Sequence, residues 1–221
     1  MVNHAVAMKL FQKAKLESVA AGSRLHIGCG QEAIPGWINI DNRALPGVDR
    51  VLDVRQGLPF DDVEAVYAEH FLEHLSLEDG LEFLRACRKV LSPQGILRLS
   101  TPNLDWVYAT HYRLGREVSD EEGLFDCLRM NRAFHGWGHQ FLYNRSMLSA
   151  AIRASGFEEV TFHRYGESGR ETLRGLERHE TWEDTEALPH VLIAEARGRS
   201  RKSQSLPEKA MAEFLEAIHI E

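Results

Sequence analysis

Cysteine is scarce in this sequence, and long apolar runs are missing. The three cysteines, Cys29, Cys87 and Cys127, are odd in number and far apart, so they fit neither a disulfide framework nor a paired CxxC metal motif. No apolar run approaches the roughly 20 residues that a membrane-spanning helix needs. We therefore expect a chain without a membrane span that works in a reducing, cytoplasmic environment.

The sequence is also short of positive charge. It has 26 basic against 33 acidic residues and a formal net charge of -7. A chain of this kind has no general attraction to phosphate backbones or anionic lipid. We expect no nucleic-acid partner, and look for a small-molecule or glycan ligand. A homo-oligomer is left open.

The first 22 residues do not resemble a signal peptide. Met8, Phe11, Leu16 and Val19 are separated by lysines at helical spacing, whereas a signal peptide needs a continuous apolar stretch. The pattern predicts a helix over residues 4–20 within an N-terminal segment 1–22.

From residue 24 onward, short apolar runs alternate with turns and helical stretches, which predicts a parallel α/β sheet. The predicted strands cover 24–27, 37–40, 50–53, 65–68, 95–100, 159–164 and 190–196, and the predicted helices cover 77–91 and 144–154. Only nine residues, 28–36, separate the first two strands. A crossover normally needs about a dozen residues, so either the first helix is reduced to a turn or the boundaries differ.

Two connections are much longer than the sheet requires. Residues 103–143 and 166–189 therefore read as insertions that cap the carboxyl ends of the strands, where long ordered loops usually carry function. Residues 197–209 read as a polar linker, followed by a small amphipathic helix over 209–218, so that 197–221 closes the chain. We predict a single domain over 1–221.

Polar residues or glycines follow four consecutive predicted strands. Gly28 and Gly30 form a Gly-x-Gly turn, Asp41 and Asp53 end the next two strands, and Glu69 ends the fourth. Because the carboxyl ends of parallel strands meet at one edge, these groups should form a ligand site there. Ala33 stands where a GxGxxG fingerprint needs its third glycine, which disfavours a nicotinamide or flavin cofactor.

With these features the sequence resembles the class I S-adenosylmethionine (SAM)-dependent methyltransferases, and in particular the branch associated with polysaccharide biosynthesis. The resemblance runs from about residue 24 to 156 and rests on LHIGCG, PGWINID, DVRQGLPF, AVYAEHFLEHL, FLRACRKVLSPQGILRLSTPN and HQFLYNRSMLSAAIRASGF. It implies a doubly wound, Rossmann-like seven-stranded sheet whose last strand is antiparallel. It also implies SAM as the cofactor, S-adenosylhomocysteine (SAH) as its product, and O-methylation of a sugar, glycan precursor or other small hydroxylated acceptor.

The same resemblance assigns cofactor contacts. Gly28 and Gly30 would pass the methionyl part, Asp41 would hold the ribose hydroxyls, Asp53 would meet the adenine amine, and Glu69 with His70 would flank the methionine end. The full implied set is Gly28, Cys29, Gly30, Asp41, Asn42, Asp53, Val54, Glu69 and His70.

A hydroxyl acceptor needs a base, and histidine titrates near neutrality. The first insertion offers His139, which we favour, and His135. Candidate acceptor-binding residues are His74, Trp106, Trp137, Tyr143, Glu177 and His179. Equally open alternatives are a structural role for His139 and a solvated charged helix around 177–179. No metal site is assigned.

Two rival functions remain. His70, Glu73 and His74 match HxxEH, in which histidines four apart on one helical face bind zinc and the glutamate acts as a base. Such enzymes set the motif within a helix and need a third ligand, whereas here the motif starts directly at the end of a strand, so a zinc hydrolase is the weaker hypothesis. The other rival is a SAM-binding protein without catalysis.

Overall fold

The computed structural model describes residues 20–112, 116–179, 185, 187–201 and 205–218. The predicted helix over 4–20 lies outside the described residues, apart from residue 20 itself. No helix in the described ranges combines the length and apolar character needed to cross a bilayer.

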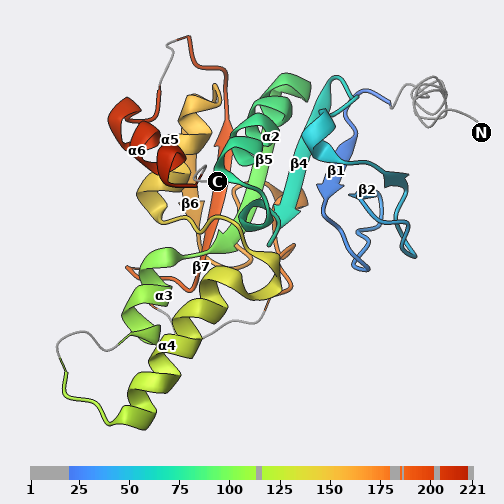
Figure 1. Cartoon of the computed structure of the whole chain (residues 1–221). Coiled ribbons are helices and arrows are strands. Elements are labelled where there is room, and N and C mark those ends of the chain that lie inside the picture. The colour runs from blue at the N-terminus through green and yellow to red at the C-terminus, as the bar shows by residue number, and fades with distance from the viewer. Residues whose placement is uncertain (1–19, 113–115, 180–184, 186, 202–204, 219–221) are drawn as a thin grey trace, which may run out of the picture.

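A seven-stranded sheet forms the centre of the molecule (Figure 1). Its strands are β1 (Arg24–Ile27), β2 (Ile38–Asp41), β3 (Arg50–Val51), β4 (Val63–Glu69), β5 (Leu91–Pro102), β6 (Glu159–His163) and β7 (Val191–Arg197). They are arranged in the order β3-β2-β1-β4-β5-β7-β6. The first five strands are parallel, and β7 runs antiparallel to both β5 and β6. The predicted α/β sheet with its late antiparallel hairpin is confirmed.

The strand order reverses beside β1. The chain runs outward from β1 to β2 and β3, and then returns to add β4 and β5 on the other side. In open α/β sheets, ligands bind at such a switch point, outside the carboxyl ends of the strands. This reversal is what brings the ends of β1, β2 and β4 to one place.

Most strand boundaries differ from the prediction by one or more residues, and two of the differences have a clear local cause. The third strand stops at Val51, because Asp53 turns the chain into η1 (Val54–Gln56) and caps it by accepting a hydrogen bond from the Arg55 amide. The fifth strand begins at Leu91. The predicted turn over 92–95 lies inside this strand and interrupts its regular pairing with β4. Val63 pairs with Leu91, whereas Ala65, two residues later, pairs with Ile96.

Helices cover one face of the sheet. They are α2 (Leu77–Val90), α5 (Arg145–Ala154) and α6 (Glu208–Ile218). Ser76 caps α2 by accepting from the Asp79 amide, and Leu81, Leu84 and Cys87 at helical spacing bury its inner side. All three helices were predicted within one residue of these bounds.

The opposite face is covered differently. The segment between β1 and β2 is a turn and not a crossover helix, which was one of the two predicted possibilities. Leu173, from the connection between β6 and β7, packs on Ile34, Trp37 and Tyr67 instead. Residues 166–179, the first part of the predicted insertion 166–189, therefore cover this face, with η4 (Glu171–Leu173) as a short turn among them.

The insertion 103–143 forms a helical hairpin of α3 (Leu104–His111) and α4 (Asp120–His135), followed by η3 (Gly136–Gly138). The hairpin projects beyond the carboxyl ends of the parallel strands (Figure 1). Asn103 caps α3, and Ser119 caps α4 in a reciprocal capping box with Glu122. One side of the hairpin therefore stands over the predicted ligand site.

Candidate functional site

Two cavities lie at the carboxyl edge of the sheet. The first, about 500 Å³, is lined by the glycine turn and the ends of β2 and β3, and we call it the glycine-turn cavity. The second, about 810 Å³, lies beneath the α3–α4 hairpin, and we call it the histidine cavity. His70, His74 and Trp137 line both. The two cavities thus meet at these three side chains.

Six of the nine predicted cofactor residues line the glycine-turn cavity: Gly28, Asp41, Asn42, Asp53, Val54 and His70. Gly28 has a φ of +66°, and a Cβ at this position would overlap the ring of Phe71. A side chain here would therefore be both strained and obstructed. Cys29 and Gly30 complete the turn behind the lining, where the Cys29 amide donates to the Ile40 carbonyl over 3.1 Å.

Asp41 is the buried acid of this cavity, with 6% of its surface exposed. One carboxylate oxygen accepts the Gly30 amide at 2.9 Å, and the other accepts the Arg43 amide at 3.0 Å and its Nε at 3.1 Å. Burial opposes ionisation, but these hydrogen bonds outweigh it and lower the pKa of Asp41. Asp41 is therefore an ionised acceptor at the end of β2.

Asp53 is the second acid of the cavity. Its carboxylate pairs with the Arg55 guanidinium, the closest contact being 2.7 Å, and this pair lowers the pKa of Asp53. The two aspartates thus offer acceptors at two separate points of one cavity.

Glu69 does not line either cavity, which corrects its assignment to the methionine end. Its Oε1 accepts the backbone amides of Arg178 and His179 at 2.8 and 3.0 Å and the His179 ring Nδ1 at 2.7 Å. Burial would raise the pKa of Glu69, yet these hydrogen bonds lower it to about 2. Glu69 therefore fixes the connection between β6 and β7 to the end of β4.

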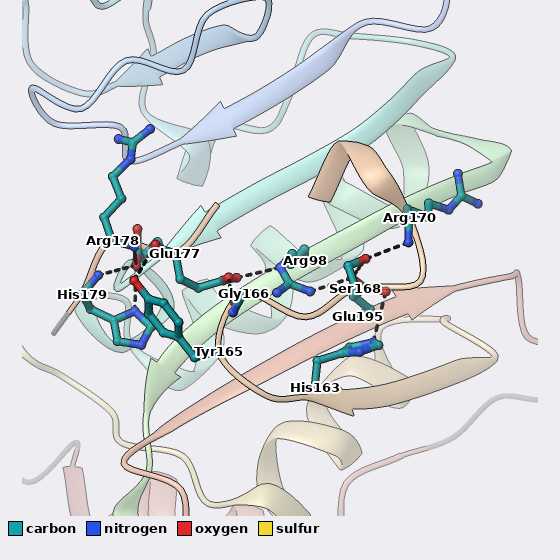
Figure 2. Close-up of polar contacts among 11 residues, drawn as sticks. Arg98, His163, Tyr165, Gly166, Ser168, Arg170, Glu177, Arg178, His179 and Glu195 are labelled. Carbon is teal, nitrogen blue, oxygen red and sulfur yellow. Dashed lines mark hydrogen bonds and ion pairs between the residues drawn. The ribbon is translucent and has the colours of Figure 1, made fainter. Parts of the chain in front are cut away.

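Glu177 also needs correction, because it is buried under the sheet and does not line an acceptor site. Figure 2 shows its carboxylate bound to Arg98, a fully buried side chain in the middle of β5. The Nε of Arg98 lies 2.7 Å from Glu177 Oε1, and its Nη1 lies 2.6 Å from Glu195 Oε1. Ser168 donates a further hydrogen bond of 2.6 Å to Glu195. This network holds residues 166–177 on the sheet.

Six histidines line the histidine cavity: His70, His74, His111, His139, His179 and His190. Trp106 and Trp137 add aromatic wall, and Arg129 and Arg132 add positive charge. Of the predicted acceptor residues, His74, Trp106, Trp137 and His179 are brought together here. Sequence reasoning missed His190 and the two arginines; the one available signal was their place beside the predicted last strand or within the predicted cap.

Two more predicted residues lie elsewhere. Tyr143 is fully buried in the main core, where its hydroxyl lies against Gly80 of α2. His135 is exposed at the end of α4 and lines neither cavity. The roles predicted for both are corrected accordingly.

His70 occupies the junction of the two cavities with a φ of +45°, a backbone conformation that non-glycine residues rarely adopt. Its Nδ1 lies 2.9 Å from Oε1 of the fully buried Glu73, whose Oε2 accepts from Thr101 Oγ1 at 3.0 Å. Burial lowers the pKa of His70, but Glu73 outweighs it and the pKa is raised.

The structure does not form the helix that the HxxEH hydrolase hypothesis requires. His70 follows β4, and Leu72–His74 is a single 3-10 turn, η2. The two histidines of the motif consequently do not share one face of an α-helix.

His139 lies on the wall of the histidine cavity. Its Nδ1 is 2.8 Å from the Ala133 carbonyl oxygen, and its ring centroid lies 5.3 Å from that of His74. Since a carbonyl only accepts, Nδ1 carries the hydrogen, which leaves the lone pair of Nε2 available. An acceptor hydroxyl in this cavity could use that lone pair.

Comparison with known protein families finds a match to the first part of the sheet. Residues 25–99, from β1 into β5, match the family described as the methyltransferase domain. No curated protein matches the chain.

Solved structures match the fold. One is a SAM-dependent methyltransferase from Thermotoga maritima, described as a possible histamine N-methyltransferase, with 13% identity and a TM-score of 0.51 over 82% of this chain and 84% of that one. Another is the CurJ carbon methyltransferase, with 19% identity and a TM-score of 0.50 over 88% of this chain and 52% of that one. The chain spans about half the length of several structures that it matches. The predicted Rossmann-like fold is confirmed, and the predicted family matches over residues 25–99.

Proposed function

We propose, for a chain whose first five strands match a methyltransferase domain, that it transfers a methyl group from SAM to a hydroxyl of a sugar, glycan precursor or other small acceptor. The observation that carries this proposal is the meeting of two cavities at His70, His74 and Trp137. One cavity carries the acids and the glycine turn suited to a nucleoside cofactor, and the other carries aromatic walls and histidines. A group-transfer enzyme needs two such sites in contact.

The residues of the glycine-turn cavity fit SAM. Its volume of about 500 Å³ lies within the range of small-molecule sites, and a vicinal diol matches the acceptor oxygens of Asp41. When bound, SAM supplies a methyl group on a positively charged sulfur, and transfer to a hydroxyl oxygen leaves neutral SAH and one released proton. Asp41 would hold the ribose, and Asp53 would lie near the base.

The histidine cavity supports a polar, ring-shaped acceptor. Trp106 and Trp137 offer faces for a sugar ring, and the histidines offer hydrogen bonds to its hydroxyls. Nε2 of His139 is placed to accept the proton that the hydroxyl loses. The sugar acceptor and the association with polysaccharide biosynthesis are proposals that rest on this cavity and on the sequence resemblance.

Asp41→Ala should weaken SAH binding at least about tenfold, because it removes the hydrogen-bond acceptors for the ribose. Isothermal titration with SAH measures the change, and Asp61→Ala, an exposed aspartate outside the cavity, is the control. Unchanged affinity in Asp41→Ala would remove this residue from the site. A wild-type chain that binds no SAH would refute the proposed function.

Gly28→Ala should weaken SAH binding more than Gly30→Ala does. Both glycines have positive φ, so both substitutions strain the backbone, but only the Cβ at Gly28 meets Phe71, whereas the space around Gly30 is open. The difference between the two SAH affinities therefore measures the effect of the clash between the new Cβ at position 28 and the Phe71 ring. Equal affinities would show that the close approach to Phe71 does not shape the cofactor site.

A further inference from the structure

Glu73, His74 and His139 bring three metal-ligating groups together on the wall of the histidine cavity. One carboxylate oxygen and one ring nitrogen of each histidine all lie within 4.8 Å of one another. We propose that these residues bind one divalent transition-metal cation, best matched by Zn²⁺, which holds a hydroxyl oxygen of the acceptor. The link to the acceptor rests on the proposed function, whereas the metal site rests on the geometry of the three side chains.

The outer contacts of two of these side chains, His139 and Glu73, are those typical of metal ligands. A ligating histidine usually donates its other ring N–H to a carbonyl or carboxylate, which orients the ring. Nδ1 of His139 donates in this way to the Ala133 carbonyl over 2.8 Å, leaving Nε2 free. The Glu73 carboxylate is likewise oriented, by Thr101 at 3.0 Å and by His70 at 2.9 Å.

The backbone holds the two halves of the site together. The Glu73 carbonyl accepts the amides of Gln140 and Phe141 at 2.7 and 3.2 Å, and the His74 carbonyl accepts from the Gln140 side chain at 2.6 Å. These bonds pin the turn that carries Glu73 and His74 to the segment that carries His139. Ligands from two distant parts of the chain, residues 73–74 and His139, are therefore held near one another before any cation arrives.

Charge also favours a cation here. Glu73 is fully buried, and in the described part of the chain its ion-pair partner is the imidazole of His70, with neither lysine nor arginine against it. Burying a carboxylate without a cationic partner is costly. A bound divalent cation would offset the cost of burying it.

The ligand set selects the kind of metal. Two imidazole nitrogens and one carboxylate oxygen form the set found in catalytic zinc sites, which keep a further position open, whereas Mg²⁺ and Ca²⁺ prefer oxygen ligands. Ligand atoms around Zn²⁺ lie about 3.3–3.5 Å apart, so the side chains must close by up to about 1.5 Å. The open position faces the cavity, where a coordinated acceptor hydroxyl gives up its proton to solvent more readily. In this arrangement His139 acts as a ligand and not as a free base.

The test is a zinc titration of the full chain after dialysis against EDTA, with the metal content measured by mass spectrometry. One Zn²⁺ per chain is expected. Glu73→Gln and His139→Ala should each lower zinc affinity at least about a hundredfold. His111→Ala is the matched control, because this histidine lines the same cavity outside the cluster, and it should retain the wild-type affinity.

The same samples are titrated with SAH, because neither Glu73 nor His139 lines the glycine-turn cavity. SAH binding therefore reports folding and tests the proposed function separately. A wild-type chain that binds SAH but no zinc overturns the metal site alone. Zinc binding that survives both substitutions also overturns it, whereas zinc binding without SAH binding supports the metal site and contradicts the proposed function.

Discussion

Arg98→Met should lower the free energy of unfolding by about 3–5 kcal/mol. Methionine keeps much of the length of arginine but removes its charge, so Glu177 and Glu195 would lose the buried guanidinium that lies 2.7 and 2.6 Å from them. Two carboxylates would then remain buried without their cation, and their mutual repulsion and desolvation carry the cost. Urea unfolding followed by circular dichroism measures the change.

Arg197→Met is the control for this experiment. Arg197 also pairs with a glutamate, Glu159, but both side chains are more than half exposed, so the loss should stay within about 1 kcal/mol. A triple variant that adds Glu177→Gln and Glu195→Gln should recover part of the stability, because it removes the stranded charges. An Arg98→Met variant as stable as the Arg197→Met control would show that the network does not support the fold.

The Arg98 network also explains why the position of Glu177 could not be predicted from the sequence. Glu177 lies in a polar stretch, where a solvated charged helix was as reasonable as an acceptor site. Its partner is 79 positions away, in the middle of β5. The available signal was Arg98 itself, a charge flanked by Leu97 and Leu99 in a strand expected to be buried. Such a charge requires a partner, but the sequence does not say which acid supplies it.

The cofactor side was more predictable for a physical reason. Strands of a parallel sheet deliver their carboxyl ends to one edge, so acids that follow successive strands must converge without any knowledge of loop conformation. Asp41 and Asp53 reached one cavity in this way. Glu69 also lies at this edge of the sheet, but its carboxylate accepts hydrogen bonds from the backbone amides of Arg178 and His179.

The cap was predictable in extent but not in orientation. Its aromatic and histidine content indicated a wall over the strand ends, and Trp106, Trp137 and His139 do line the histidine cavity. Tertiary packing decides which face of α4 points toward the cavity and in which direction the chain continues after α4. His135 and His139 are four residues apart, yet the turn at η3 leaves one exposed and brings the other to the cavity.

His139→Ala should lower turnover by about a hundredfold or more while leaving SAH affinity unchanged. Its Nε2 is the free ring nitrogen on the cavity wall, and both roles proposed for it, proton acceptor and metal ligand, use that lone pair. Its side chain does not line the glycine-turn cavity, so cofactor binding should not depend on it. SAH release measures turnover, once a panel of nucleotide sugars and glycans has yielded an acceptor.

His135→Ala separates this effect from a general disturbance of the hairpin, because His135 ends the same helix but lines neither cavity. It should retain wild-type turnover. If His139→Ala also retained it, the hydrogen bond to Ala133 would be the whole role of His139, namely to hold the hairpin against the sheet. If His139→Ala lowers both turnover and zinc affinity, the lone pair of His139 holds the cation. If His139→Ala lowers turnover and the wild-type chain binds no zinc, the lone pair of His139 takes the proton.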